Sequence, residues 1–260
     1  FEYYIDSRNV PWFYIPAWIL ITTPLYLSIL FFIGSFYLLF ELCRFFLLKK
    51  KSININLIYD FYFILILVSS IFAVIIFNST LYNGWRQLYF IYPSFLLISI
   101  SGLNFFFKKL KHNMLIKLFV FFLITNIFTT FLWMIKNHPH QYAYFNYLAG
   151  NELNKKFDVD YYGLSYKENF HYLLNNDSSN KIYLYNLSKN NRLFYHLLAL
   201  NDQDRQKIIE VKDIERSEYL ITNYHIDKTN YDENFFKKYK IFNDIKVGEN
   251  SINTIFKKIN

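Results

Sequence analysis

The sequence predicts an α-helical polytopic membrane domain of about four transmembrane helices, followed by a small α/β domain. Of the 260 residues, 53% are hydrophobic and only 18% are charged, whereas soluble domains carry about a quarter of charged residues. The long apolar runs lie in the first half of the chain, and the second half alternates short apolar segments with polar turns. The single cysteine, Cys43, excludes a disulfide scaffold and a multi-cysteine zinc site.

The net charge of +8 is unevenly distributed along the chain. Residues 1–135 hold 10 Lys and Arg against 4 Asp and Glu, and residues 136–260 hold 18 against 16. The excess therefore lies in the apolar half, where basic residues between hydrophobic stretches report membrane orientation. We expect a lipid bilayer as a partner and no nucleic acid.

Four stretches are long enough to span a bilayer, which takes about 20 mostly apolar residues. The first runs from about 18 to 40, with apolar residues continuing toward 48, and we expect Pro24 within its first turns. The others run from about 57 to 77, 88 to 107 and 115 to 135. Together they define a predicted transmembrane domain over residues 1–137.

The short loops predict the orientation of these spans. Lysines cluster in the first and third loops, at Lys49, Lys50, Lys51, Lys108, Lys109 and Lys111, whereas the second loop, 78–87, has only Arg86. The positive-inside rule places the lysine loops in the cytoplasm, and Trp12, Trp18, Trp85 and Trp133 then fall at the outer ends. We expect a multi-pass protein of the cytoplasmic (inner) membrane whose C-terminal domain is extracytoplasmic, in the periplasm.

Residues 138–260 are predicted to form the α/β domain. Helical spacing of apolar residues occurs at 163–175 and 191–200, and strand-like patterns occur at 181–187 and 218–223. The segments 239–247 and 254–259 are expected to pair as a hairpin through the turn at 248–250. About 120 residues suffice for one modest core.

Two polar pairs in this domain allow alternative interpretations. His138 and His140 flank Pro139, which is expected to hold them extended; they are either metal ligands or ordinary interfacial histidines. Asp158 and Asp160 would share a face of a strand and hold a cation or a sugar hydroxyl, or else are solvated acids on a loop. Signatures of metalloproteases, hydrolases and nucleotide-binding loops are absent from the sequence. We expect no cofactor, with a divalent cation as the open alternative.

The outward loop at 81–87 is the stronger candidate site. It contains Tyr82, Trp85, Arg86 and Gln87, and it leads into a helix without charge. Arginine at the start of such a helix can bind a phosphate bidentately, and free helical N–H groups would add to the attraction. These four residues are therefore candidates for binding a lipid phosphate, while an interfacial, snorkelling arginine is the alternative.

Three segments resemble bacterial family-39-like glycosyltransferases of the GT-C fold, relatives of protein O-mannosyltransferases and of the lipid A aminoarabinose transferase. PWFYIPAWILITTPL is similar to their entry into a membrane helix, and YNGWRQLYFIYPSFLLISISGL to a later helix entrance. HPHQYAYFNYLAG followed by DVDYYGLSYKENFHYL resembles the stretch after their last span. The resemblance covers residues 9–25, 81–103 and 138–173. The family's frequent Asp-Trp-Gly-Gln reads Asp-Tyr-Tyr-Gly here, from Asp160 to Gly163.

The resemblance implies the C-terminal part of an enzyme that moves a sugar from a polyprenyl-phosphate donor to a lipid, glycan or protein outside the cytoplasmic membrane. It implies that the acidic general base lies upstream of Phe1 and that Arg86 neutralises the departing phosphate. It also implies that residues 1–260 alone are inactive as an enzyme. The alternative is a non-enzymatic, membrane-anchored envelope subunit that presents an α/β interaction module.

Overall fold

The computed structural model describes residues 5–47, 55–188, 192–227 and 229–259. Two compact units divide the chain: Phe1–Lys136 with Phe145–Ala149, and Asn137–Tyr144 with Gly150–Asn260. We call them the membrane unit and the α/β unit. The predicted lysine cluster at Lys49, Lys50 and Lys51 lies outside the described residues.

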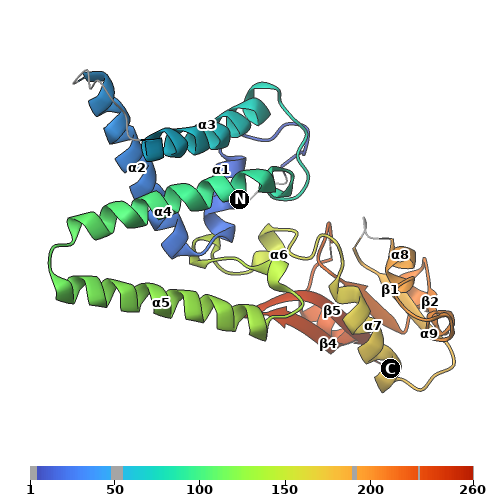
Figure 1. Cartoon of the computed structure of the whole chain (residues 1–260). Helices are drawn as coiled ribbons and strands as arrows, with labels where there is room; N and C mark the ends of the chain where they lie inside the picture. The colour runs from blue at the N-terminus through green and yellow to red at the C-terminus, as the bar shows by residue number, and fades with distance from the viewer. Residues whose placement is uncertain (1–4, 48–54, 189–191, 228, 260) are drawn as a thin grey trace. The chain divides into compact units, whose positions relative to one another are not determined.

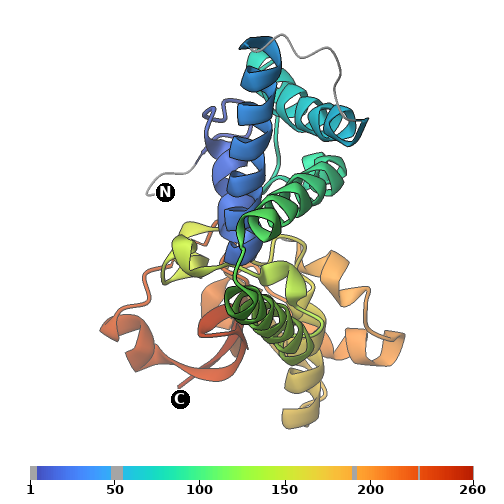
Figure 2. The same cartoon turned by 60° about the vertical axis from the view of Figure 1, so that its left-hand side comes forward.

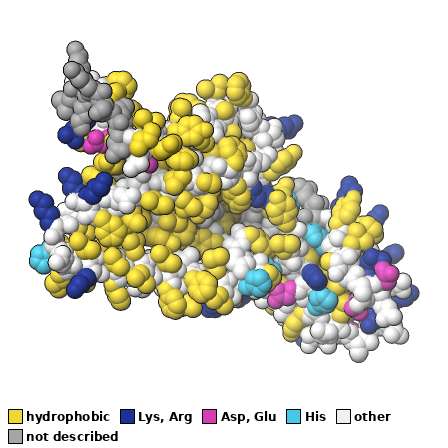
Figure 3. Space-filling model, in the orientation of Figure 1, with side chains coloured by type: hydrophobic (Ala, Val, Ile, Leu, Met, Phe, Trp, Pro, Cys, Tyr) yellow, Lys and Arg dark blue, Asp and Glu magenta, His cyan; other side chains and the backbone are white. Residues whose placement is uncertain are grey.

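The membrane unit contains four helices that are long and apolar enough to cross a bilayer, as the sequence predicts. These candidate spans are Leu25–Leu47, Ile55–Ile76, Arg86–Lys109 and Asn113–Lys136. The third combines a 3₁₀ segment, η1 (Arg86–Ile91), with α4 (Tyr92–Lys109); the others are α2, α3 and α5. On the face that Figure 3 shows, hydrophobic side chains cover much of the surface of these helices. Phe36, Leu65 and Phe121 are among the most exposed of them. Such surfaces are stable in lipid, so the chain is a multi-pass membrane protein.

The first span differs from its predicted bounds of 18–40. A short helix, α1 (Tyr14–Thr22), ends before Pro24, and α2 begins at Leu25 and continues to Leu47. Thr23 between them is extended, with φ −111° and ψ 142°. The proline ring disfavours the helical conformation of the preceding residue. Pro24 therefore separates two helices, and our expectation that it lies inside the first turns of one continuous span was wrong.

Glycines set the packing of α2 against α4, which cross in both views (Figures 1 and 2). A Cβ atom added at Gly34 would lie 2.0 Å from the carbonyl oxygen of Ile98, and one at Gly102 would lie 2.1 Å from that of Leu30. Stacked rings flank the crossing on either side, with centroids 4.5 Å apart for Phe31–Phe95 and 4.8 Å for Tyr37–Phe105. Small residues permit this backbone approach, as is common between membrane helices.

The α/β unit is built on a mixed five-stranded sheet in the order β2-β1-β3-β5-β4. β1 pairs in parallel with β2 and β3, and β5 pairs antiparallel with β3 and β4. The strands are β1 (Ile182–Asn186), β2 (Ile208–Glu210), β3 (Tyr219–Thr222), β4 (Tyr239–Val247) and β5 (Asn250–Lys258). The short helices and turns of the unit are η2 (Gln141–Ala143), α6 (Leu153–Lys156), α7 (Ser165–Asn176), α8 (Leu193–Leu197), α9 (Asp202–Lys207), η4 (Ile214–Arg216) and α10 (Glu233–Lys238).

Each face of the sheet carries its own hydrophobic cluster. Side chains of α7 and α8, such as Phe170 and Leu193, pack with Tyr219 and Ile221 of β3 on one face. Leu220 of the same strand points to the opposite face, because side chains alternate along a strand, and it packs in a second cluster with Tyr239 and Phe256.

The predicted elements of this unit are largely confirmed. The helix at 163–175 corresponds to α7, the strands at 181–187 and 218–223 to β1 and β3, and the hairpin to β4 and β5, which begins earlier than expected. The helix predicted at 191–200 is shorter, since α8 covers Leu193–Leu197. β2 was not predicted; its three residues are too few to display an alternating pattern.

Candidate functional site

The loop at 81–87 of the membrane unit is fixed against α1. The hydroxyl of Tyr14 donates to the carbonyl oxygen of Tyr82 over 3.3 Å and accepts from the backbone N–H of Gly84 over 3.1 Å. Gly84 has φ +72°, a conformation that glycine adopts without strain, and its Cα faces the ring of Trp18. The loop at 81–87 is thus held in one conformation by residues more than 60 positions earlier.

Trp85 anchors this loop from the inside. Its side chain is buried, and its indole N–H donates to the hydroxyl of Thr22 over 3.0 Å. The ring also contacts Tyr89 and Tyr92, with centroids 4.9 and 5.8 Å away. Of the four residues proposed from the sequence, Trp85 therefore positions the loop, since its own surface is almost wholly used in packing.

Arg86 lies on the partly exposed side of the same loop, at the first residue of η1. Its Nε donates to the carbonyl oxygen of Asn83 over 2.8 Å, which orients the guanidinium group. The side-chain oxygen of Gln87 accepts from the N–H of Tyr82 over 3.2 Å and closes the loop. The ring of Tyr82 is exposed. Arg86, Gln87 and Tyr82 are thus gathered by one short loop.

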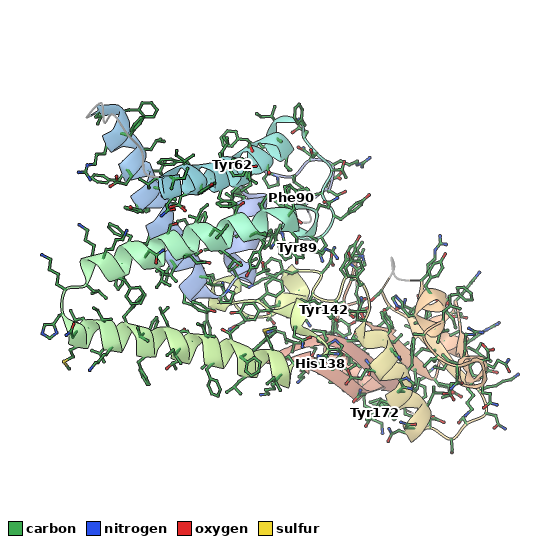
Figure 4. All side chains as sticks on the ribbon, viewed as in Figure 1. Tyr62, Tyr89, Phe90, His138, Tyr142 and Tyr172 are labelled. Carbon is green, nitrogen blue, oxygen red and sulfur yellow. The ribbon has the colours of Figure 1, made fainter. Side chains whose placement is uncertain are left out.

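The local helix geometry corrects one expectation about Arg86. α4 begins at Tyr92, with Pro93 in its first turn, and η1, which starts at Arg86 within the loop, precedes it. The free N–H groups of the first α-helical turn therefore lie beyond η1, and we assign them no part in anion binding at Arg86. In their place, η1 presents Tyr89 and Phe90, both more than half exposed (Figure 4). These two aromatic residues were not singled out from the sequence.

Asn146 brings a third segment onto α1. Its side-chain N–H₂ donates to the carbonyl oxygens of Leu20 and Thr23 over 2.6 and 2.7 Å, and its backbone N–H donates to Ile21 over 2.9 Å. The last carbonyl groups of a helix lack hydrogen-bond donors within the helix. Asn146 supplies such donors at the end of α1. The neighbouring ring of Phe145 lies 5.7 Å from that of Trp18. The YFN run was part of the resemblance, but this role was not predicted.

His138 and His140 of the α/β unit have separate partners. His138-Pro139-His140 forms a turn rather than the expected extended run, with the N–H of His140 donating to the carbonyl oxygen of Asn137 over 2.6 Å. His140 is buried and its Nε2 lies 2.9 Å from a carboxylate oxygen of Glu168. Exposed His138 lies with its Nδ1 2.9 Å from the side-chain nitrogen of Gln141 (Figure 4). Among the described residues, no three His, Cys, Asp or Glu side chains are grouped to hold a metal ion.

Asp160 caps the start of α7 and is fully buried. One carboxylate oxygen accepts from the hydroxyl of Tyr142 over 2.6 Å and from the N–H of Leu164 over 3.1 Å. The other accepts from the N–H and the hydroxyl of Ser165. Burial raises the pKa of the Asp160 carboxyl, and the hydrogen bonds from Ser165 and Tyr142 act in the opposite direction. Four donors around one carboxylate indicate a structural role.

Asp158 and Asp160 do not share a strand face, and they are not two solvated loop acids. The chain turns between them and the start of α7. Asp158 is directed instead to His225, whose Nδ1 lies 2.8 Å from its carboxylate, and about a third of the Asp158 side chain is exposed. The two acids thus have different surroundings: Asp160 is enclosed by donors, and Asp158 remains accessible from solvent.

We expect Asp160→Asn to destabilise the α/β unit. The amide keeps the size of the carboxylate but turns one acceptor into a donor that faces Ser165 or Leu164. A buried donor left without an acceptor costs about 1–3 kcal/mol. Limited proteolysis of the membrane-embedded protein at rising temperature, with fragments of 137–260 identified by mass spectrometry, measures the loss. Asp202→Asn is the matched control, because Asp202 is an exposed acid on α9. Equal cleavage temperatures for both variants would contradict the capping role.

No protein-family model, no curated protein and no solved structure matches this chain. The fold defines a multi-pass membrane protein with an α/β unit. The geometry assembles two places of chemical interest, the Arg86 loop and the surroundings of Asp158.

Proposed function

We propose that the chain belongs to a membrane glycosyltransferase that takes its sugar from a polyprenyl-phosphate donor. One observation carries the proposal: parts of all three segments that resemble GT-C glycosyltransferases, although far apart in sequence, contact one another in the membrane unit. Trp85 of the second segment donates to Thr22 of the first, and Asn146 of the third binds the end of α1. These contacts between the segments support the proposal.

The chemistry of such a transfer suits the Arg86 loop. The departing group is a lipid phosphate, whose negative charge increases as the bond to the sugar breaks. A preorganised cation at that point lowers the activation free energy of the transfer. A guanidinium group suits this role because two of its N–H groups can donate to two phosphate oxygens at once. The bond from Arg86 to Asn83 fixes its direction before the substrate arrives. The exposed rings of Tyr89 and Phe90 offer an apolar surface to the attached polyprenyl chain.

The other parts of the reaction are assigned by resemblance. The acceptor hydroxyl of a lipid, glycan or protein needs a general base, which the family provides from an acidic residue. Asp160 is a poor candidate for that role, because its carboxylate is enclosed and already accepts four hydrogen bonds. The α/β unit is thus an accessory to the transfer in this proposal.

The reaction takes place on the outer side of the cytoplasmic membrane. Lys108 and Lys109 lie in the last turn of α4, and Lys111 follows before α5. Positive charges in a short connection favour the cytoplasm. The loop at 81–87 lies at the other end of the same span, so Arg86 and the chain that follows α5 face outward.

A single experiment tests the activity and its side. Sealed vesicles that contain the intact membrane protein are prepared right-side-out and inverted, and each is given a water-soluble, short-chain polyprenyl-phosphate sugar with a radiolabel. We expect labelled product in right-side-out vesicles and very little in inverted ones until detergent is added. Product in inverted vesicles only would show that the site faces the cytoplasm and would contradict the proposed orientation. No product in either preparation, even with detergent, would favour the non-enzymatic envelope subunit.

A further inference from the structure

The parallel part of the sheet creates a second place where a ligand can bind. β1 and β3 are parallel neighbours, and the connections that leave their carboxyl ends run in opposite directions, to β2 at one edge and toward β4 at the other. In α/β sheets, ligands bind outside the carboxyl ends of strands at such a switch point. Here Ser188 follows β1, and Asn223 and His225 follow β3.

The connection after β3 has a strained backbone at this point. Tyr224 and Ile226 have φ of +63° and +49°. Positive φ is unusual for residues other than glycine and is an outlier for a β-branched residue such as Ile226. Strain of this kind persists only where the surroundings enforce it, and it concentrates at functional sites.

Side chains from both strands enforce that conformation. The hydroxyl of Ser188 accepts from the N–H of Asn223 over 3.1 Å, and the hydroxyl of Thr222 accepts from that of Tyr224 over 2.9 Å. The N–H of His225 donates to the side-chain oxygen of Asn223 over 3.3 Å. His225 is therefore presented in a fixed position, nearly buried, at the switch point.

His225 meets an acid and an aromatic surface there. Its Nδ1 lies 2.8 Å from the carboxylate of Asp158, and its ring contacts that of Tyr161 edge-on at 5.4 Å. The ring of Tyr162 lies 5.4 Å from that of Tyr161 and is 62% exposed. The surface thus joins a solvent-accessible carboxylate, an oriented imidazole and two tyrosine rings.

We propose that Asp158, His225, Tyr161 and Tyr162 form a saccharide-binding subsite. The carboxylate of Asp158 accepts hydrogen bonds from sugar hydroxyl groups, and such charge-assisted bonds are strong. An exposed tyrosine ring packs against the apolar C–H face of a pyranose and adds a polar hydroxyl. The site is less suited to a divalent cation, which prefers several oxygen ligands. Asp160 is not available as a second carboxylate ligand, because it accepts hydrogen bonds at the start of α7. The subsite does not depend on the proposed transfer, because a glycan-binding subunit would use it in the same way.

Saturation-transfer NMR tests the subsite. The intact protein in nanodiscs is mixed with methyl glycosides of glucose, mannose and N-acetylglucosamine, and dissociation constants are taken from titrations. We expect millimolar binding of at least one glycoside, weakened about tenfold or more by Asp158→Asn. Tyr162→Ala should weaken it about threefold or more. Asp202→Asn and Tyr172→Ala are matched controls, since Asp202 is an exposed acid on α9 and Tyr172 lies toward the other end of α7 (Figure 4).

Three results would overturn the proposal. Binding that is unchanged in Asp158→Asn and Tyr162→Ala, with unaltered thermal midpoints, would place the saccharide elsewhere. Binding that requires Mg²⁺ or Mn²⁺ and disappears with a chelator would indicate a metal site, and no binding of any glycoside would remove the subsite. The readout is glycoside binding and not sugar transfer, so the outcome is independent of the proposed donor site.

Discussion

Arg86→Ala is expected to lower the rate of sugar transfer by roughly 10- to 150-fold. The substitution removes a charge-assisted contact to the lipid phosphate, which contributes about 1.5–3 kcal/mol, and each 1.36 kcal/mol corresponds to a factor of ten in rate. Arg86→Lys keeps the positive charge but loses the planar fork, and it should recover only part of the activity. The measurement is product formation by the intact protein over a range of donor concentrations.

Arg8→Ala is the matched control for this prediction. Arg8 also belongs to the membrane unit and precedes α1, but its guanidinium pairs with Asp6 at an exposed position. Removing an exposed ion pair costs little, so transfer should stay near the wild-type rate. If Arg86→Ala and Arg8→Ala transfer sugar equally well, Arg86 is an interfacial anchor and the donor site lies elsewhere.

Gly102→Ala is expected to destabilise the membrane unit by about 3 kcal/mol or more. The added methyl group would meet backbone atoms, which cannot move aside as a flexible side chain can. The added methyl group would lie 2.1 Å from the carbonyl oxygen of Leu30, and the same change at Gly34 would meet that of Ile98 at 2.0 Å. α2 and α4 would have to separate, and the stacked rings beside the crossing would lose contact. The thermal midpoint of the detergent-solubilised protein, followed by size-exclusion chromatography, reports this loss.

Leu39→Ala provides the comparison on the same helix. Leu39 is half exposed on α2, and a smaller side chain on a lipid-facing surface should change the midpoint only slightly. Equal midpoints for Gly102→Ala and Leu39→Ala would mean that the two helices do not approach as closely as described.

Features with a local cause were accessible from the sequence, and those that depend on distant partners were not. Composition identified the four spans, and alternation identified β1, β3 and the hairpin. Arg86 was singled out because it is the only basic residue of its loop, and its role in binding stays a prediction. The contact of Trp85 with Thr22 joins residues 63 positions apart. That separation leaves no periodic signal in the sequence.

The acidic pair shows the same limit. Asp158 and Asp160 are two residues apart, which suggests a shared face. In the structure, Asp160 instead binds Ser165 and Tyr142, and Asp158 binds His225. The cap on α7 had a local signal, an acid shortly before the helix start. The bond to His225 had none, because β3 and its strained connection reach Asp158 only through the fold of the sheet.

The position of 145–149 has a consequence for the modularity of this protein. The chain leaves the membrane unit after Lys136, returns to it at Phe145–Ala149, and leaves it again. Two bodies joined by one linker can be exchanged between proteins by a single recombination event, whereas these two share three junctions. A cut after residue 136 would strip the end of α1 of Asn146 and expose carbonyl groups that it now satisfies. A single cut after residue 136 therefore does not separate the two units cleanly, because it also removes hydrogen bonds that belong to the membrane unit.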